Sequence, residues 1–325
     1  MSKIFWQDKR VFVTGCTGLL GSWLTATLLQ SKAHVVGLVR DQIPHSQLIR
    51  TGNINHIDIV RGDVCDYQLI ERALAEYEID TIFHLAAQTQ VGIANRVPLP
   101  TFESNIKGTW VLLEAARRNP TVKRIVTASS DKAYGTHAEL PYTEDAPLQG
   151  EHPYDVSKSC ADLISRSYAH TYNLPVVVTR CANLYGGGDL NWNRIVPGTI
   201  RSVLRGEAPI IRSDGTMKRD YIYIMDVVRG YMMVAQNMHR DEVRGQAFNF
   251  GIDNPISVLE MANTIIQLSD HGQLDPVILD EVDNEIQDQY LCSDKAGDVL
   301  GWEPQFSLVQ GLAETMTWYK EFLEL

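Results

Sequence analysis

The first part of the chain alternates between short apolar runs and longer segments whose apolar residues recur at helical spacing. The apolar runs, which we expect to be strands, are residues 9–14, 34–39, 57–60, 81–85, 124–128 and 175–179. The segments with helical spacing, which we expect to be helices, are residues 19–29, 66–77, 101–118 and 154–172. Strands that are apolar throughout and alternate with helices indicate an α/β fold, a doubly wound parallel sheet covered on both faces.

The alternation ends after Arg180. Residues 183–197 are rich in Gly, Asn and Trp and are expected to form a structured loop. Beyond them we expect short strands at 221–224 and 247–250 and helices at 195–205, 225–236, 258–268 and 308–323. This change of pattern predicts a smaller mixed α/β domain folded onto the sheet.

Composition narrows the possible partners. The 325 residues are 44% hydrophobic and 21% charged, as in a folded globular protein, and the net charge is −11. An acidic chain is poorly suited to binding nucleic acid or an anionic membrane, so we expect neither as a partner. Membrane-spanning segments need about 18 apolar residues in a row, and no run approaches that length.

The N-terminus and the cysteines bear on location. Residues 1–10 are polar and mixed in charge, unlike a signal peptide. The five cysteines are scattered without paired spacing, which argues against a disulfide framework and against a zinc site. We therefore expect a cytoplasmic protein with no metal.

A glycine-rich turn separates the first expected strand from the first expected helix. Its glycines are three residues apart, a spacing that permits a tight turn, close approach to a pyrophosphate, and packing of the helix on the strand. The helix N-terminus adds amide donors and a partial positive charge. This combination predicts a Rossmann domain that binds NAD(P). The residues expected at the cofactor are Gly15, Thr17, Gly18, Leu19, Leu20 and Gly21.

Domain boundaries follow from the same reading. We expect the Rossmann domain to cover residues 1–182, with returns to it near 219–252. A substrate-binding domain would then combine residues 183–218 with residues 253–325.

The end of the second expected strand carries two opposing signals for the choice of dinucleotide. Arg40 suits the 2′-phosphate of NADP, whereas Asp41, the next residue, suits the ribose diol of NAD. Asp63, after the third strand, is a candidate for the adenine edge or for a helix N-cap. The choice between NAD and NADP therefore stays open.

Tyr154 and Lys158 are four residues apart in an expected helix, and so lie on one face. A phenol with its usual pKa near 10 is a poor base at neutral pH, and a nearby ammonium lowers that pKa by stabilising the phenolate. Ser130 follows the fifth expected strand, at the carboxyl edge of the sheet where ligands bind in such folds.

These residues resemble the extended short-chain dehydrogenase/reductases of the NAD-dependent epimerase/dehydratase family, which act on nucleotide sugars. The match is carried by the glycine turn, Ser130 and Y-x-x-x-K at Tyr154, together with H-L-A-A from His84 and N-I-K-G-T from Asn105. It continues through R-C-A-N-L-Y-G-G-G from Arg180 and K-R-D-Y-I from Lys218, so it spans nearly the whole chain.

The resemblance implies a catalytic triad of Ser130, Tyr154 and Lys158. It places Asn183 near the sugar or phosphate and Arg219 near the diphosphate, and it implies a homodimer or a dimer of dimers through helices near 101–118 and 154–172. The further cofactor contacts that it implies are Val64, Leu85, Ala86, Ala87 and Asn105.

Asp131 and Lys132 stand where dehydratases of this family carry an acid/base pair. Loss of water across C5 and C6 of the sugar needs two proton-transfer groups beside the triad, whereas 4-epimerisation does not. An Asp-Lys pair resembles CDP-glucose 4,6-dehydratases, while Val39-Arg40 resembles GDP-mannose 4,6-dehydratases. Lys132 would act as a neutral base, as an ammonium that stabilises the enolate, or only as a solvated loop charge.

Further candidates would hold the substrate. Arg194, Arg212 and Arg219 suit a diphosphate because guanidinium binds phosphate in a bidentate manner, and Gln88 could meet the sugar. The sequence thus predicts a nucleotide-sugar 4,6-dehydratase, with CDP-glucose as the first candidate substrate. A 4-epimerase is the main alternative; a net reductase and a non-catalytic dinucleotide sensor are less well supported by the residues.

Overall fold

The computed structural model describes residues 3–281 and 286–324. Within them, seven parallel strands form the central sheet in the order β11-β6-β5-β4-β1-β2-β3. The strands are β1 (Arg10–Thr14), β2 (His34–Val39), β3 (Asp58–Arg61), β4 (Thr81–His84), β5 (Arg124–Ala128), β6 (Val176–Cys181) and β11 (Ala247–Phe250). The expected parallel α/β sheet is confirmed.

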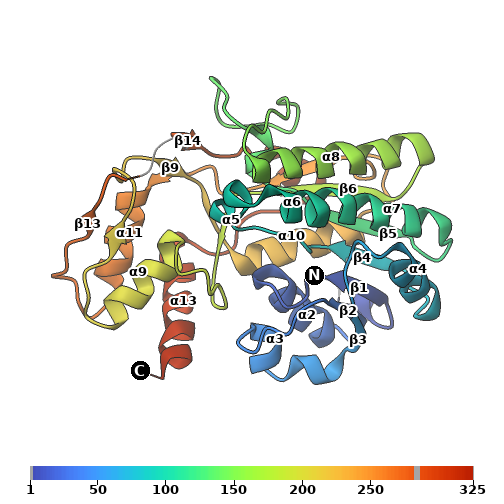
Figure 1. The fold of residues 1–325 in the computed structure, drawn as a ribbon, viewed down its shortest axis with the longest axis horizontal. Helices are drawn as coiled ribbons and strands as arrows, with labels where there is room; N and C mark the ends of the chain where they lie inside the picture. The colour runs from blue at the N-terminus through green and yellow to red at the C-terminus, as the bar shows by residue number, and fades with distance from the viewer. Residues whose placement is uncertain (1–2, 282–285, 325) are drawn as a thin grey trace.

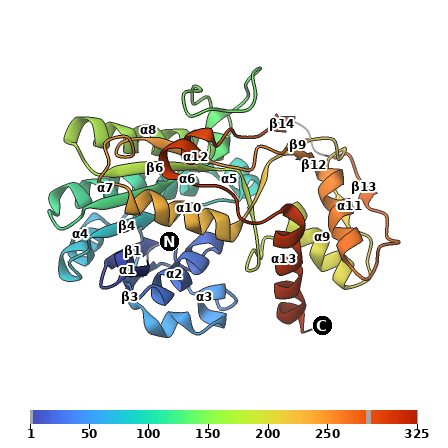
Figure 2. The same ribbon diagram turned by 180° about the vertical axis from the view of Figure 1, so that it is seen from behind.

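Helices cover both faces of this sheet (Figures 1 and 2). On one face, α2 (Leu19–Gln30) contacts α10 (Ile224–Gln236). On the other face, α7 (Gly108–Arg118) packs between α4 (Tyr67–Glu76) and α8 (Pro153–Tyr172). Their buried apolar residues form two separate clusters with the strands, which is the burial expected of a doubly wound sheet.

The later part of the chain gathers beside the carboxyl edge of the sheet (Figure 1). Its helices are α9 (Ile195–Leu204), α11 (Val258–Leu268) and α13 (Leu308–Leu323), which share a cluster of buried apolar residues. Its short strands are β7 (Asn183–Tyr185), β8 (Ile210–Ile211), β9 (Lys218–Arg219), β10 (Tyr221–Tyr223), β12 (Ile256–Ser257), β13 (Val277–Ile278) and β14 (Asp288–Gln289). The division of the chain into two domains at the expected boundaries stays a prediction.

Several short elements differ from the expectations. The helix expected over 101–118 consists of α6 (Pro98–Phe102), a π-helical turn η2 (Glu103–Lys107) and α7, and the expected loop at 183–197 begins with β7. Elements of four to seven residues are too short to show an apolar period. Those that the pattern missed are α1 (Lys3–Trp6), α3 (Gln47–Arg50), η1 (Asn53–His56), α5 (Val91–Arg96), η3 (Asp131–Tyr134) and α12 (Asp294–Leu300). Over the described ranges, no helix is long and apolar enough to cross a membrane.

A buried ion pair joins the sheet to the helix α8. Arg180 of β6 and Asp162 of α8 are fully buried, with Nε 2.8 Å from Oδ2 and Nη2 3.0 Å from Oδ1. Arg180 Nη1 also donates to the Tyr134 hydroxyl at 2.8 Å and to the carbonyl of Glu144 at 2.9 Å. One guanidinium therefore fixes β6, α8, η3 and the loop after η3 relative to one another.

A buried histidine links β1, β4 and α7. Thr14 Oγ1 accepts from the amides of Leu85 and Ala86, both at 3.1 Å, so its own proton points to His84 Nδ1 at 2.9 Å. His84 Nε2 then carries the ring proton and donates to Thr109 Oγ1 at 3.2 Å. Burial and the nearby Lys158 lower the pKa of His84 to about 3, so the ring is neutral in the folded chain.

Substitution of Arg180 by Met should leave the Asp162 carboxylate buried without a counter-charge. We expect Arg180→Met to lower the free energy of unfolding by about 3–5 kcal/mol in urea titrations. Arg72→Met, which removes a half-exposed i,i+4 pair with Glu76, is the control and should cost less than about 1 kcal/mol. Equal losses in the two variants would contradict the structural role of Arg180.

His84 should make stability depend on pH. The unfolded chain protonates this side chain near its ordinary pKa of 6.5 and the folded chain only near 3, so stability falls as pH falls through that interval. Between pH 6.5 and pH 5 the wild type should lose about 2 kcal/mol more unfolding free energy than His84→Gln. His34→Gln, at an exposed position, is the control. The idea fails if wild type and His84→Gln show the same pH slope in urea titrations.

Candidate active site

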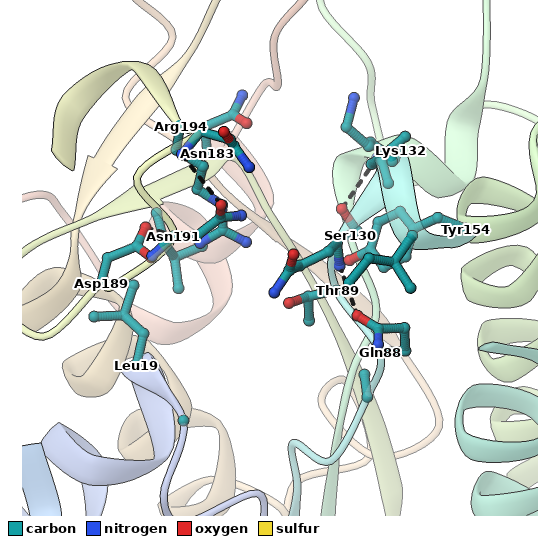
Figure 3. Close-up of a pocket in the computed structure, with 18 of the residues that line it drawn as sticks. Leu19, Gln88, Thr89, Ser130, Lys132, Tyr154, Asn183, Asp189, Asn191 and Arg194 are labelled. Carbon is teal, nitrogen blue, oxygen red and sulfur yellow. Dashed lines mark hydrogen bonds and ion pairs between the residues drawn. The ribbon is translucent and has the colours of Figure 1, made fainter. Parts of the chain in front are cut away.

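A cleft of about 1620 Å³ runs along the carboxyl edge of the central sheet. Of the site residues expected from the sequence, all but Asn105 line it. Figure 3 shows its two walls: Gln88, Ser130, Lys132 and Tyr154 lie on one side and face Asn183 and Arg194 across the opening. The first wall comes from the ends of β4 and β5 and the start of α8, and the second comes from β7 and the loop before α9.

The glycine turn leaves room for a ligand at one end of the cleft. Gly15 has a φ of +71°, and a Cβ there would lie 2.8 Å from the amide nitrogen of Ala86. A Cβ at Gly21 would collide with the carbonyl oxygen of Gly15. Gly18 caps α2 without a side-chain hydrogen bond, so the first amides of that helix are left for an anion. This cradle fits the pyrophosphate of a dinucleotide.

Arg40, Asp41 and Asp63 form a charged cluster at the same end. Arg40 Nε donates to Asp41 Oδ2 at 2.7 Å, and Arg40 Nη1 lies 3.7 Å from Asp63 Oδ2. The helix-cap role considered for Asp63 belongs instead to Asp66, whose side chain accepts from the amide of Leu69. Both carboxylates therefore offset the charge of Arg40 at the position where the two dinucleotides differ.

Asn105 lies behind the wall of the cleft. Its Oδ1 accepts from the amide of Gln88 at 2.7 Å, and its Nδ2 donates to the carbonyl of Gln88 at 3.1 Å and to Ser157 Oγ at 2.8 Å. Both ends of the buried amide are used within the wall, and the expected cofactor contact of Asn105 stays a prediction. Asn105 supports the backbone of Gln88, which does line the cleft.

The structure brings Ser130, Tyr154 and Lys158 together. Ser130 follows β5, and its Oγ donates to Asp131 Oδ1 at 2.9 Å. Tyr154 lies in the first turn of α8, which begins at Pro153, and Lys158 lies one turn later with Nζ 6.0 Å from the centre of the Tyr154 ring. Lys158 Nζ also donates to the carbonyl of Ala128, at the end of β5, at 2.8 Å.

Burial dominates the electrostatics of this group. It raises the pKa of Tyr154 to about 12, although the Arg194 guanidinium and the Ser130 hydroxyl act in the opposite direction. This is the reverse of the lowering expected from Lys158. Burial also lowers the pKa of Lys158 to about 8. The phenol therefore needs further positive charge in the cleft before it can give up its proton readily.

Asp131 and Lys132 extend the triad. Asp131 is 3% exposed, and burial raises its pKa despite the nearby charge of Lys132. Among the described residues, nothing forms a hydrogen bond with its Oδ2. Lys132 Nζ donates to Oε1 of the buried Gln289 at 3.3 Å, so it is more than a solvated loop charge. A carboxyl group whose pKa is raised and which has an unused oxygen can act as a general acid.

The arginines on the opposite wall differ in how their donors are used. Arg194 Nη1 donates to Asp189 Oδ2 at 2.9 Å, and Arg212 Nη2 donates to Asn193 Oδ1 at 2.8 Å. Arg219 is buried, and its Nη1 donates to the carbonyls of Lys218 and Gln287, both at 2.9 Å. All three line the cleft, but the Arg219 guanidinium is held partly by the protein's own backbone.

Sequence reasoning missed several residues of the site. Thr89, Asp189 and Asn191 line the cleft (Figure 3), and Gln289 reaches Lys132 from a strand 157 residues away. Asp189 follows the glycines at 186–188, a run that carried part of the family resemblance and was given no role. Nothing in a single sequence connects Gln289 to Lys132, because only the pairing of β14 with β9 brings it there.

Comparison with known proteins agrees with the fold. A family model described as GDP-mannose 4,6 dehydratase matches residues 12–315. CDP-glucose 4,6-dehydratase of Salmonella typhimurium is 30% identical, over 99% of this chain and 94% of that protein.

Two solved structures are similar over almost their whole length. dTDP-glucose 4,6-dehydratase of Bacillus anthracis, in complex with NAD, gives a TM-score of 0.85 at 27% identity and covers 98% of each chain. UDP-glucose 4-epimerase of Thermotoga maritima, with UDP-glucose, gives 0.87 at 27% identity and covers 97% of this chain and 99% of the other. The family match thus spans nearly the whole chain, and the structure supplies the Rossmann sheet, the glycine turn and the tyrosine–lysine helix. The chain therefore belongs to the GDP-mannose 4,6 dehydratase family, within the Rossmann-fold NAD-dependent nucleotide-sugar epimerases and dehydratases.

Proposed function

We propose that this protein is a nucleotide-sugar 4,6-dehydratase, which converts an NDP-hexose to the NDP-4-keto-6-deoxyhexose. The observation that carries the proposal is the Asp131 carboxyl, which is buried beside Ser130 with Oδ2 unused among the described residues. Burial raises its pKa and favours the protonated form. A dehydratase needs such an acid to protonate the departing C6 hydroxyl, whereas a 4-epimerase has no step for it.

The residues of the first wall supply the proton transfers. Tyr154 takes the proton of the sugar C4 hydroxyl, and the Ser130 hydroxyl holds the C4 oxygen by a hydrogen bond. A bound NAD(P) supplies reversible hydride acceptance, so that the hydride lost at C4 is regained at C6. The C4 ketone acidifies the C5 proton, which passes to the Lys132 amine, while Asp131 protonates the C6 hydroxyl as it leaves as water.

Lys132 assists at C5. Its charge acts on Asp131 and on Asp155, and in both it opposes the rise in carboxyl pKa that burial causes. We assign it the base role: the neutral amine accepts the C5 proton and returns it to C5 when hydride reaches C6, and the ammonium formed in between stabilises the enolate oxygen at C4.

We infer that the cofactor is NAD. Asp41 and Asp63 both lie against Arg40, so a 2′-phosphate would meet two carboxylates beside one guanidinium. The ribose diol of NAD would instead find an acceptor in Asp41. The Bacillus anthracis relative in complex with NAD supports the same choice.

CDP-glucose is the substrate that we propose first. This choice of substrate rests on the 30% identity to the CDP-glucose 4,6-dehydratase of Salmonella typhimurium and on the Asp-Lys pair after Ser130. The second candidate function is nucleotide-sugar 4-epimerisation, which the structural similarity to the Thermotoga maritima epimerase favours. Both reactions begin with the loss of the C4 hydroxyl proton to Tyr154, so the fate of C6 separates them.

The substrate and the acid role can be tested together by mass spectrometry. We expect wild-type protein, offered CDP-, dTDP-, UDP- and GDP-hexoses, to give a product lighter by one water with CDP-glucose. Asp131→Asn should lower the rate by about 10²–10⁴-fold, because an amide cannot donate the proton. Asp145→Asn, an exposed position outside the cleft, is the matched control and should keep the wild-type rate.

A product isomeric with its substrate would contradict the dehydratase assignment. A near-wild-type dehydration rate in Asp131→Asn would remove the role given to that carboxyl.

The dinucleotide can be identified after the purified protein is denatured. We expect a bound dinucleotide to be released, because a family member that regenerates its cofactor in each turnover gains from holding it tightly. We expect it to be NAD and not NADP, because Asp41 and Asp63 lie against Arg40. Asp41→Asn should weaken NAD binding about tenfold by removing a charge-assisted hydrogen bond to the ribose. Arg40→Ala should change it less. Release of NADP, or a larger loss in Arg40→Ala, would reverse the assignment.

A further inference from the structure

The glycine-rich loop at residues 186–188 is held in place by the last helix. The Trp318 ring of α13 packs so closely on Gly187 that a Cβ at that glycine would collide with it. Trp23 Nε1 of α2 donates to the carbonyl of Gly187 at 2.7 Å. The hydroxyl of Tyr319, a fully buried residue of α13, donates to the carbonyl of Asp189. The backbone at 187–189 is thus fixed from two sides.

The carboxylate of Asp189 is held just as firmly. Its side chain is 6% exposed, Oδ1 accepts from the amide of Asn191 at 3.0 Å, and Oδ2 accepts from Arg194 Nη1 at 2.9 Å. The Arg194 side chain is 39% exposed and faces the cleft opposite Ser130 and Tyr154 (Figure 3). A buried carboxylate therefore holds one end of a guanidinium whose other end meets the open cleft.

Most donors of Arg194 are still available for a ligand. A guanidinium has five N–H groups, and among the described residues only Asp189 accepts from that of Arg194. A guanidinium already oriented by a carboxylate loses little side-chain freedom when it binds a second anion. Two phosphate groups present acceptors that match this fork.

We propose that Asp189, anchored by Tyr319, is a positioning residue that holds the Arg194 guanidinium in place for the diphosphate of the nucleotide sugar. This inference rests on the proposed function for the identity of the ligand. It gives α13, which lies outside the central sheet, a part in assembling the substrate site. It also assigns a role to an acidic residue at a site that binds an anion, where carboxylates are otherwise unfavourable.

Calorimetric binding of a nucleoside diphosphate tests the proposal without catalysis. The probe is whichever of CDP, dTDP, UDP and GDP the wild-type protein binds most tightly. We expect Asp189→Asn to weaken it about tenfold, since hydrogen bonds to charged groups contribute on that scale. Arg194→Gln should weaken it at least as much, and the double variant no more than Arg194→Gln alone. Tyr319→Phe, which removes only a hydroxyl, should weaken binding in the same direction.

Asp270→Asn is the matched control, since Asp270 pairs with Lys320 of α13 but is exposed and outside the cleft. It should bind the probe like wild type. In steady-state assays, Asp189→Asn should raise KM with little change in kcat, and its NAD content should stay at the wild-type level. A general loss of structure would lower kcat and NAD content as well.

Additive effects of Asp189→Asn and Arg194→Gln, or unchanged affinity in both Asp189→Asn and Tyr319→Phe, would overturn the proposal. Absence of binding to all four nucleoside diphosphates by wild-type protein would overturn it together with the proposed function. If wild-type protein binds a nucleoside diphosphate but releases no dehydrated sugar, only the proposed function fails. The binding series then still decides the role of Asp189.

Discussion

The buried guanidinium of Arg180 is the interaction on which the active-site wall depends. Its ion pair with Asp162 fixes α8, which carries Tyr154 and Lys158, against β6. Its bond to Tyr134 fixes η3, in which Asp131 and Lys132 precede that tyrosine by two or three residues. The Tyr134 hydroxyl in turn donates to Asn249 of β11 at 2.7 Å. Arg180 thus fixes α8 and η3, the two elements that carry most of the proposed catalytic residues, because its buried charge is paired with groups on both.

Exclusion of water by burial, which surrounds the Arg180–Asp162 pair, also determines the pKa values of nearby ionisable groups. Burial raises the pKa of Tyr154 and of Asp131, and it lowers the pKa of Lys158 and of His84. Each of these groups is therefore shifted toward its neutral form. A raised pKa suits Asp131 to donate a proton to a leaving hydroxyl, and the raised pKa of Tyr154 means that this phenol needs a nearby cation before it can act as a base. The opposite wall supplies fixed charge instead, through the Asp189–Arg194 pair. The proposed function assigns the proton transfers to the first wall and the substrate diphosphate to the second.

The sequence was most informative where chemistry is local. The glycine turn, the Tyr154–Lys158 spacing and the residues after β5 each depend on neighbours a few positions away, and the structure gathers them at one cleft. Apolar runs predicted six strands of the sheet and a short strand at the position of β11, but helical spacing did not reveal the π-helical turn η2 that divides an expected long helix. Motif and position alone do not reveal that the Asn105 amide forms hydrogen bonds with Gln88 and Ser157. The positions of Gln289 and Asp189 in the site depend on contacts between residues far apart in the sequence, and the spacing of residues along the chain does not predict such contacts.

The proposed reaction transfers one hydride from C4 to C6 of the same hexose. The most direct measurement uses CDP-glucose carrying deuterium at C4, with the position of the label in the product read by NMR. The account predicts deuterium in the C6 methyl group of a 4-keto product that has lost water. Deuterium retained at C4 in a hexose of unchanged composition would contradict it and identify an epimerase.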